Sequence, residues 1–339
     1  MYKITSFLSF TQQAHSLSLC TKDWFSLLLD ISKIAAPYQK YLTTQIQLSM
    51  DASREADISV LPEGCISDVL SFTTPRDACT LSTVSSLFNN AAQSDAVWER
   101  FLPADFRSII CRSGDHHSLL ASSSSKKHLF FRLCQNPILI DDGRRSFVLD
   151  KWTGKKCYML SARDLAIVWS DTPDYWRWVP DPGSRFAEVA ELIGVCWLEI
   201  NGRINTQMLS PATMYTAYLV FKLATGASGF RSQNAEVSVG LAGSTFSFKR
   251  SVLLDARIGR GRNLLLDNWF GSKAYVPAGG GDGRYPEVRK DGWLEIKLGE
   301  FLNKESEDGE LEMSITEVKG GHWKHGLVVQ GIEIRPKIE

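Results

Sequence analysis

The stretch MYTAYLVFKL, residues 214–223, decides the fold class of the longer part of this 339-residue chain. Its side chains alternate between two sets, which is the period of a β-strand whose successive side chains point to opposite faces. The two sets are Tyr215, Ala217, Leu219 and Phe221, and Thr216, Tyr218, Val220 and Lys222. The same alternation recurs in AEVSVGLAG (235–243), TFSFKR (245–250), WLEIKLGEF (293–301) and ELEMSITEV (310–318). Residues 147–339 are therefore predicted to form an all-β antiparallel sandwich or jelly roll.

Two details refine the prediction for this β-rich region. Asn201 and Gly202 stand between two alternating runs in CWLEINGRINTQML (196–209), and this dipeptide predicts a tight hairpin turn because such turns need positive φ. The segment RFAEVAELI (185–193) has apolar residues at helical spacing, which predicts a short helix.

Residues 57–105 have helical periodicity instead. Pro62 and Pro75 suit the first turns of two helices, and Thr74 suits a helix cap. Apolar residues then recur three, four or seven positions apart in three groups: Ile66, Val69 and Leu70; Leu81, Val84 and Phe88; Val97, Trp98 and Phe101. Three helices in fewer than fifty residues are near the lower limit for an independent core, so a partner that covers one apolar face would add stability.

The remaining segments are predicted to be an extension and a connector. Residues 1–49 contain no Arg, and Met50 opens a segment typical of a protein start, so we expect 1–49 to be poorly structured or a mis-annotated extension. Residues 106–146 are a connector in which HHSLLASSSSKKH (116–128) has the composition of a linker. Net charge is −6 over residues 51–105 and +4 over 106–146, which suggests modules with separate partners.

Composition argues against several classes of function. The chain has 38 basic and 38 acidic residues, so nothing draws it as a whole to nucleic acid or to an anionic membrane, and neither is expected as a partner. The longest apolar run near the N-terminus, WFSLLLDI (24–31), is too short to cross a bilayer. Seven cysteines without C-x-x-C spacing are expected to be reduced thiols of an intracellular protein, located in the cytoplasm or also in the nucleus.

The sequence offers little for catalysis. His322 and His325 have no cysteine or acidic pair at ligand spacing, so no metal site is expected. No phosphate-binding or dinucleotide-binding glycine motif and no G-x-S-x-G occurs, so we expect no cofactor and no enzymatic activity. Carboxylates on strands, such as Glu295 and Glu300, are commonly only solvated.

The stretch WSDTPDYWRWVP, residues 169–180, holds three tryptophans and one tyrosine. Alternation in YWRWV places Trp176 and Trp178 on one face of a strand. Two interpretations stay open for them and for Trp169. They are core residues, or they are exposed aromatic planes that stack on a sugar ring or a base, because buried indoles need partners for their N–H groups.

The helical segment resembles an F-box in the order and spacing of L-P, the apolar helix, P-R-D-A, L-S-x-V-S-x-x-F and V-W-E-R-F-L-P. The resemblance implies binding to the Skp-type adaptor of a cullin-containing ubiquitin ligase. It assigns an apolar adaptor-binding surface to Leu61, Pro62, Ile66, Val69, Leu70, Leu81, Val84 and Trp98. The alternative is that several of these residues only hold the helices together. Ser86 stands where the family usually has a basic residue.

Residues 147–339 resemble the phloem protein 2 lectin domain of plants. The resemblance rests on four blocks in the right order, among them KCYMLSARDLAIVWSDTPDYWRW (156–178) and GLVVQGIEIRP (326–336). It implies binding of N-acetylglucosamine oligomers or N-glycan cores. Trp169 and Trp176 match two tryptophans implicated in sugar binding by the related tobacco-type lectins, Trp178 is a further candidate, and Glu295 or Glu300 would supply the acidic residue.

Together the two resemblances identify the chain as similar to plant F-box proteins of the phloem protein 2-B type. They imply a non-catalytic substrate receptor of a Skp–cullin–F-box ubiquitin ligase that recognises glycans or glycoproteins. Two alternatives remain: a cytosolic defence or stress lectin, and a sandwich that binds protein without binding sugar. The sequence leaves open the ubiquitination target, the glycan, the oligomeric state and the regulation.

Overall fold

The computed structural model describes residues 61–231, 233–244, 247–255, 283–305 and 308–337. The chain divides into two compact units, Met1–Cys65 and Ile66–Glu339. The expected N-terminal extension and the Met50 start lie outside the described residues, as do parts of the TFSFKR run and of the glycine-rich loop near residue 280.

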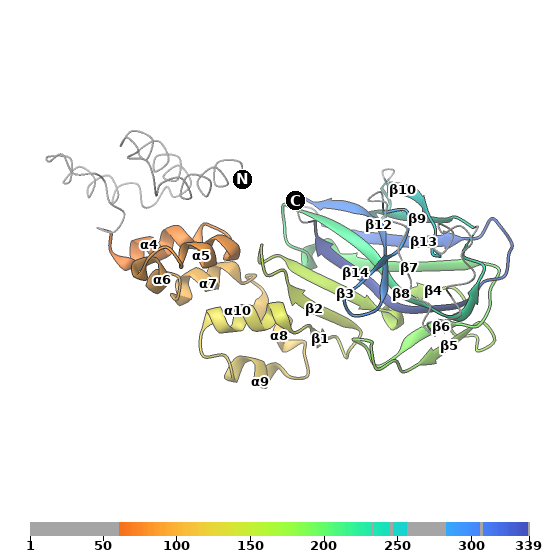
Figure 1. The fold of residues 1–339 in the computed structure, drawn as a ribbon, viewed down its shortest axis with the longest axis horizontal. Coiled ribbons are helices and arrows are strands. Elements are labelled where there is room, and N and C mark those ends of the chain that lie inside the picture. The colour runs from red at the N-terminus through yellow and green to blue at the C-terminus, as the bar shows by residue number, and fades with distance from the viewer. Residues whose placement is uncertain (1–60, 232, 245–246, 256–282, 306–307, 338–339) are drawn as a thin grey trace, which may run out of the picture. The chain divides into compact units, whose positions relative to one another are not determined.

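Short helices form the first part of the described chain (Figure 1). They are α4 (Glu63–Ser71), α5 (Pro75–Leu81), α6 (Ser86–Ala91), α7 (Asp95–Phe101), α8 (Phe106–Cys111), α9 (His116–Ala121) and α10 (Lys126–Gln135). The predicted start of α5 is confirmed, because Pro75 is its first residue and the Thr74 hydroxyl accepts a hydrogen bond from the Asp77 N–H.

Two helical segments differ from the expectation. The apolar spacing of Leu81, Val84 and Phe88 does not lie on one helix, since α5 ends at Leu81 and α6 begins at Ser86, with Ser85 as its cap. The serine-rich segment expected as a linker contains α9 and the start of α10. Ser125 accepts a hydrogen bond from the His128 N–H at 3.1 Å, so this serine begins a helix rather than interrupting one.

Antiparallel strands form the rest, as the alternation predicted. The strands are β1 (Ile138–Ile140), β2 (Arg145–Leu149), β3 (Lys156–Ser161), β4 (Ala166–Ile167), β5 (Trp176–Val179), β6 (Val189–Leu192), β7 (Leu198–Asn205), β8 (Thr213–Ser228), β9 (Ala235–Leu241), β10 (Ser247–Val252), β11 (Glu287–Val288), β12 (Leu294–Asn303), β13 (Glu310–Glu317) and β14 (His325–Pro336), with short 3-10 turns η2 (Ala162–Asp164) and η3 (Thr206–Met208).

Within the described residues the strands form two sheets (Figure 1). The larger has the order β1-β2-β3-β14-β8-β12-β11, with β6 also paired to β14 and β5 paired to β6. The smaller has the order β10-β9-β13-β7-β4. The segment 214–223 lies within β8, in the middle of the larger sheet between β14 and β12.

Apolar side chains fill both faces of the larger sheet. One face packs on the smaller sheet and contributes Leu160, Leu219, Ile296 and Ile332, all fully buried. The opposite face carries a second, smaller core under the chain between β5 and β6. That core consists of Met159, Phe186, Val189, Val220 and Trp293. The larger sheet is therefore covered, at least in part, on both sides.

Two predictions for the β-rich region are wrong. Asn201 and Gly202 do not form a hairpin turn, because β7 continues through them and pairs with β13. A Cβ atom on Gly202 would lie 2.9 Å from the Ile332 side chain of the other sheet, so this glycine permits close packing of the sheets rather than a turn. Residues 185–193 hold strand β6 rather than a helix, because pairing with β5 and β14 overrides the helical spacing.

Candidate functional site

Trp169 is the exposed aromatic residue of the tryptophan-rich segment. It follows β4, and 41% of its surface is accessible. Its φ of +61° lies in the left-handed region, which bulky residues rarely adopt. The Trp169 carbonyl accepts a hydrogen bond from the Thr172 N–H at 3.0 Å and closes a tight turn. Strained backbone of this kind persists only where the surroundings fix it, and it is concentrated at functional sites.

The two other tryptophans fix this turn. The Trp176 indole donates to the Val168 carbonyl at 3.1 Å, and the Trp178 indole donates to the Ser170 carbonyl at 3.0 Å. These carbonyls belong to the residues on either side of Trp169. Trp176 and Trp178 therefore lie on one face of β5, as their alternation predicted, and their N–H groups hold the loop that presents Trp169.

The environments of the three indoles differ. Trp176 is buried, with 2% of its surface exposed, whereas Trp178 is half-buried and lies under the Arg163 guanidinium at 3.7 Å. The Trp169 ring packs against the Tyr175 ring, with centroids 5.3 Å apart and planes 39° from parallel. Trp169 is the most exposed of the three indoles, and its ring lies against the half-buried ring of Tyr175. We call this pair the aromatic platform.

Glu295 and Glu300 lie elsewhere, on β12. Four strand pairings separate Trp178 on β5 from Glu295 on β12. Across the sheet, Trp178 lies opposite Ala190, Ala190 opposite Val329, Val329 opposite Phe221, and Phe221 opposite Leu294, the residue before Glu295. Four strand steps correspond to about 19 Å. The structure therefore does not bring these two carboxylates to the aromatic platform.

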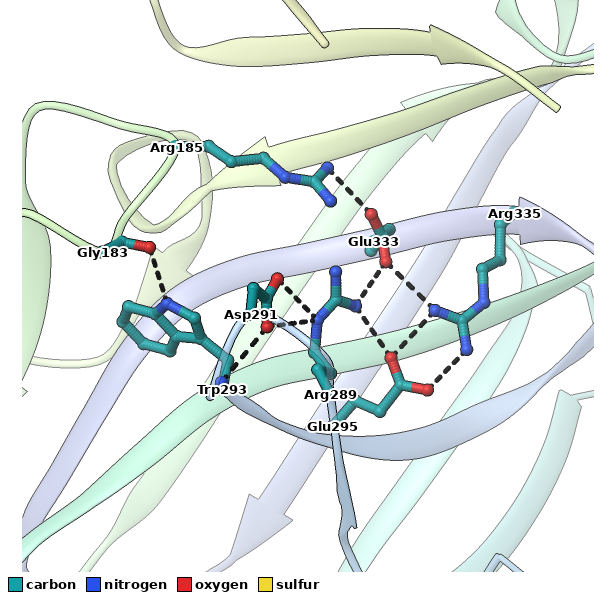
Figure 2. Close-up of polar contacts among 8 residues, drawn as sticks. All are labelled: Gly183, Arg185, Arg289, Asp291, Trp293, Glu295, Glu333 and Arg335. Atoms are coloured by element: carbon teal, nitrogen blue, oxygen red, sulfur yellow. Dashed lines mark hydrogen bonds and ion pairs between the residues drawn. The ribbon is translucent and has the colours of Figure 1, made fainter. Parts of the chain in front are cut away.

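Glu295 belongs to a network of ion pairs (Figure 2). Arg335 contacts Glu295 at 2.5 Å and Glu333 at 3.2 Å, and Arg289 contacts the same two carboxylates at 2.8 and 2.6 Å. Arg185 adds a further contact to Glu333 at 2.8 Å. Each carboxylate thus has at least two arginine partners. The network is internally paired, which suits a structural role.

The same region holds Trp293 in place. Its indole donates to the Gly183 carbonyl at 2.9 Å, and its backbone N–H donates to Asp291 at 3.2 Å (Figure 2). The Lys222 ammonium lies 3.9 Å from the ring. Trp293 is fully buried, so it anchors the covering chain at Gly183. Glu300 pairs with Lys297 and Lys337 further along β12.

The network makes stability depend on pH. Burial alone would raise the pKa of Glu333, but Arg185, Arg289 and Arg335 outweigh it and hold the pKa below its ordinary 4.5. The hydrogen bond from Lys297 likewise lowers the pKa of Glu300. A carboxyl with a lowered folded-state pKa contributes stability above its unfolded pKa and loses it as pH falls through the folded value.

We therefore expect the thermal unfolding midpoint of the full chain to fall as pH decreases from about 5 to about 3. Circular dichroism melts at stepped pH would measure it. A Glu333→Gln variant, which cannot titrate at this position, should show a shallower pH dependence. A midpoint that is independent of pH in the wild type would contradict the assignment.

The predicted adaptor-binding residues divide by burial. Ile66, Leu70 and Trp98 are fully buried in the helical part itself, and Trp98 packs on Phe130 and Phe131. Leu61, Val69 and Leu81 are half-buried, and Pro62 and Val84 are exposed. Val84, in the turn after α5, is 61% exposed.

Sequence reasoning did not single out several residues of these sites. Arg289 and Glu333 were missed because they pair with each other across a long separation in sequence. Two further exposed tryptophans, Trp197 and Trp323, were also missed, since a tryptophan in an alternating run such as CWLEI is typical of a core. No role was assigned to Tyr175 from the sequence.

Two other kinds of site are absent from the described ranges. No group of three or more His, Cys, Asp or Glu residues there could hold a metal ion. No helix among the same residues is both long enough and apolar enough to cross a bilayer.

Comparison with known proteins identifies the family. Residues 155–336 match the phloem protein 2 family model, and residues 58–103 match the F-box-like model. Among similar proteins of Arabidopsis thaliana, putative F-box protein PP2-B12 is 47% identical and F-box protein PP2-B10 is 44% identical. These alignments cover 82% and 84% of this chain, and 97% and 96% of the relatives.

The solved structure of TmCBM61 in complex with β-1,4-galactotriose aligns with 51% of this chain and covers 87% of its own. Its TM-score of 0.26 and identity of 10% are too low to support any conclusion.

The matches to family models and relatives extend over both the helical and the β-rich parts. The chain therefore belongs to the phloem protein 2 family and is an F-box protein of the PP2-B type.

Proposed function

We propose that the β-sandwich binds carbohydrate on the aromatic platform formed by Trp169 and Tyr175. The observation that carries this proposal is the exposed indole of Trp169 on a left-handed backbone, fastened through the carbonyls of both neighbouring residues. A pyranose ring has an apolar face of C–H groups that packs on an indole, and aromatic rings add binding energy beyond the area they bury.

The roles within the tryptophan segment differ under this proposal. Trp169 is the stacking residue. Trp176 and Trp178 are positioning residues, because their indole N–H groups are used to hold the loop. Glu295 and Glu300 belong to the network and to the lysine pairs on β12, so they act on a ligand at the platform only through the fold. N-acetylglucosamine oligomers are the ligands to test first.

We further propose that the chain is a substrate receptor of a Skp–cullin–F-box ubiquitin ligase. The F-box-like region supports recruitment of a Skp-type adaptor. Val69, Leu81 and Val84 keep accessible apolar surface for that contact, whereas Ile66, Leu70 and Trp98 support it from the interior. Ubiquitin transfer itself would take place on other subunits, so this chain would contribute recognition and no catalysis.

Trp169→Ala should abolish measurable binding of N-acetylglucosamine oligomers, because it removes the exposed plane. Trp178→Phe keeps an aromatic ring but loses the hydrogen bond to Ser170, and it should weaken binding without abolishing it. Glycan-array binding followed by calorimetry on the full chain would measure both. Glycan binding that is unchanged in a folded Trp169→Ala variant contradicts the platform.

A folded wild type that binds no glycan would favour the alternative of a protein-binding sandwich. Capture of a peptide ligand that Trp169→Ala abolishes would then assign the platform to protein recognition.

Val84→Asp should reduce capture of a plant Skp-type adaptor by at least tenfold, because it buries a charge in an apolar contact. Because Val84 is exposed, the fold should tolerate this change. The double variant Val69→Asp, Val84→Asp should abolish capture. Val288→Asp, at a residue 48% exposed on β11, is the matched control. Full capture of the adaptor by both the single and the double variant, with unchanged thermal melts of both proteins, would contradict the proposal.

A further inference from the structure

Trp197 and Trp323 are exposed tryptophans outside the segment 169–178. Trp197 precedes β7 and is 44% exposed, and Trp323 precedes β14 and is 64% exposed. Exposed apolar side chains that lie together can mark an interaction site.

A buried lysine holds these two tryptophans. The Lys324 side chain is inaccessible to solvent, and its ammonium pairs with the buried carboxylate of Glu317. The ammonium also donates to the carbonyls of Cys196 at 3.0 Å and His322 at 2.8 Å, which precede Trp197 and Trp323 directly. Backbone hydrogen bonds of 2.8 and 3.0 Å join Lys324 to Val195. The two tryptophans are thus fastened on either side of one internal anchor.

Both rings have further supports. The Trp197 indole donates to a Glu199 carboxylate oxygen at 2.9 Å, and the other Glu199 oxygen accepts from the Asn201 amide at 3.1 Å. A Cβ on Gly194 would lie 3.7 Å from the Trp323 ring, so this indole lies against bare backbone. A carboxylate has about four acceptor positions, so Glu199 can still accept a hydrogen bond from a ligand hydroxyl.

The segment from Ile193 to Glu199 connects this pair to the aromatic platform. The N–H groups of Ile193 and Gly194 donate to the Tyr175 carbonyl at 2.9 and 3.4 Å. At its other end, the Glu199 carbonyl accepts from the Val168 N–H at 3.1 Å, directly before Trp169. The segment that carries Trp197, and against which the Trp323 ring lies at Gly194, is therefore hydrogen-bonded at one end to Tyr175 and at the other to the residue before Trp169.

We propose that Trp197 and Trp323 form a second aromatic subsite, which binds a distal residue of an oligosaccharide whose first residue lies on Trp169. This inference rests on the proposed carbohydrate binding. It commits to an uncharged sugar chain, because the Glu199 carboxylate beside Trp197 suits hydroxyl donors and repels phosphate. The subsite makes affinity increase with the length of the ligand.

The test is calorimetry of the full chain with N,N′-diacetylchitobiose and with N-acetylchitopentaose. The wild type should bind the pentasaccharide more tightly than the disaccharide. Trp323→Ala and Trp197→Ala should each weaken pentasaccharide binding about tenfold and leave disaccharide binding unchanged. Trp152→Ala is the matched control. It removes a tryptophan of similar exposure, 43%, in the turn between β2 and β3, and it should change neither affinity.

The outcomes separate this inference from the function on which it rests. An unchanged preference for the longer ligand in both variants overturns the second subsite and leaves the platform intact. An equal loss for both ligands also overturns it, since the residues would then not act on a distal sugar. A folded wild type that binds neither ligand overturns both proposals together.

Discussion

Lys324→Met should destabilise the protein by about 4 kcal/mol, the largest effect that we expect from one substitution. The lysine side chain has no solvent exposure, and Glu317 is 6% exposed, so methionine fills the volume but leaves a buried carboxylate without its cation. The carbonyls of Cys196 and His322 lose their shared donor as well. Removing one member of a buried ion pair costs more than the pair contributes, because the remaining charge cannot be hydrated.

Urea unfolding of the full chain, followed by circular dichroism, measures this change. Lys319→Met is the matched control, because Lys319 pairs with Glu236 at 3.4 Å on the surface with 87% of its side chain exposed; there we expect less than about 1 kcal/mol. Combining Lys324→Met with Glu317→Met should restore part of the stability, since no charge then stays buried. A loss below about 1 kcal/mol in the single variant would falsify the role of Lys324 as an anchor.

Arg289→Met should destabilise the protein by about 3 kcal/mol. Its guanidinium lies between Glu295 and Glu333 with 10% of its side chain exposed. The expected loss is smaller than at Lys324 because Arg335 still contacts both carboxylates. The pKa of Glu333 should rise toward its ordinary value once one of its arginine partners is gone, so this variant should also unfold at higher pH than the wild type on acidification.

The control for this change is Arg203→Met. Arg203 pairs with Glu312 at 2.6 Å, but 63% of its side chain is exposed, so its removal should cost less than about 1 kcal/mol. Urea unfolding at neutral pH gives the stability, and acid titration of the melting midpoint gives the shift. Equal effects of the two substitutions would show that burial of the network does not matter.

Local patterns were sufficient for much of the fold. The alternation around Tyr215 and Leu219 predicted β8, because one face of this strand, from Tyr215 to Phe221, is buried along its length. Thr74 and Pro75 predicted the start of α5, because a cap depends only on its own turn. Each of these predictions depends on interactions between residues that are close in sequence.

Where distant segments meet, the sequence misled or was silent. Asn201 and Gly202 form a dipeptide that is typical of a hairpin turn. In the structure, the missing side chain of Gly202 instead makes room for Ile332 from the opposite sheet. The pairing of Arg289 with Glu333 depends on how β11 and β14 approach, which no local pattern encodes. The three indoles of 169–178 have no local feature that separates them, and their burial and the carbonyls that two of them bind distinguish the exposed one.

The backbone conformation of Trp169 has a consequence for the thermodynamics of recognition. Holding a bulky residue at φ +61° costs about 1 to 3 kcal/mol, and this cost is met during folding. A ligand that bound at the ring as proposed would therefore not have to order the loop, so little conformational entropy would be lost on binding. The same rigidity would disfavour molecules that need the indole to turn toward them. Selectivity at Trp169 would then come from the shape of the ligand rather than from adaptation of the protein.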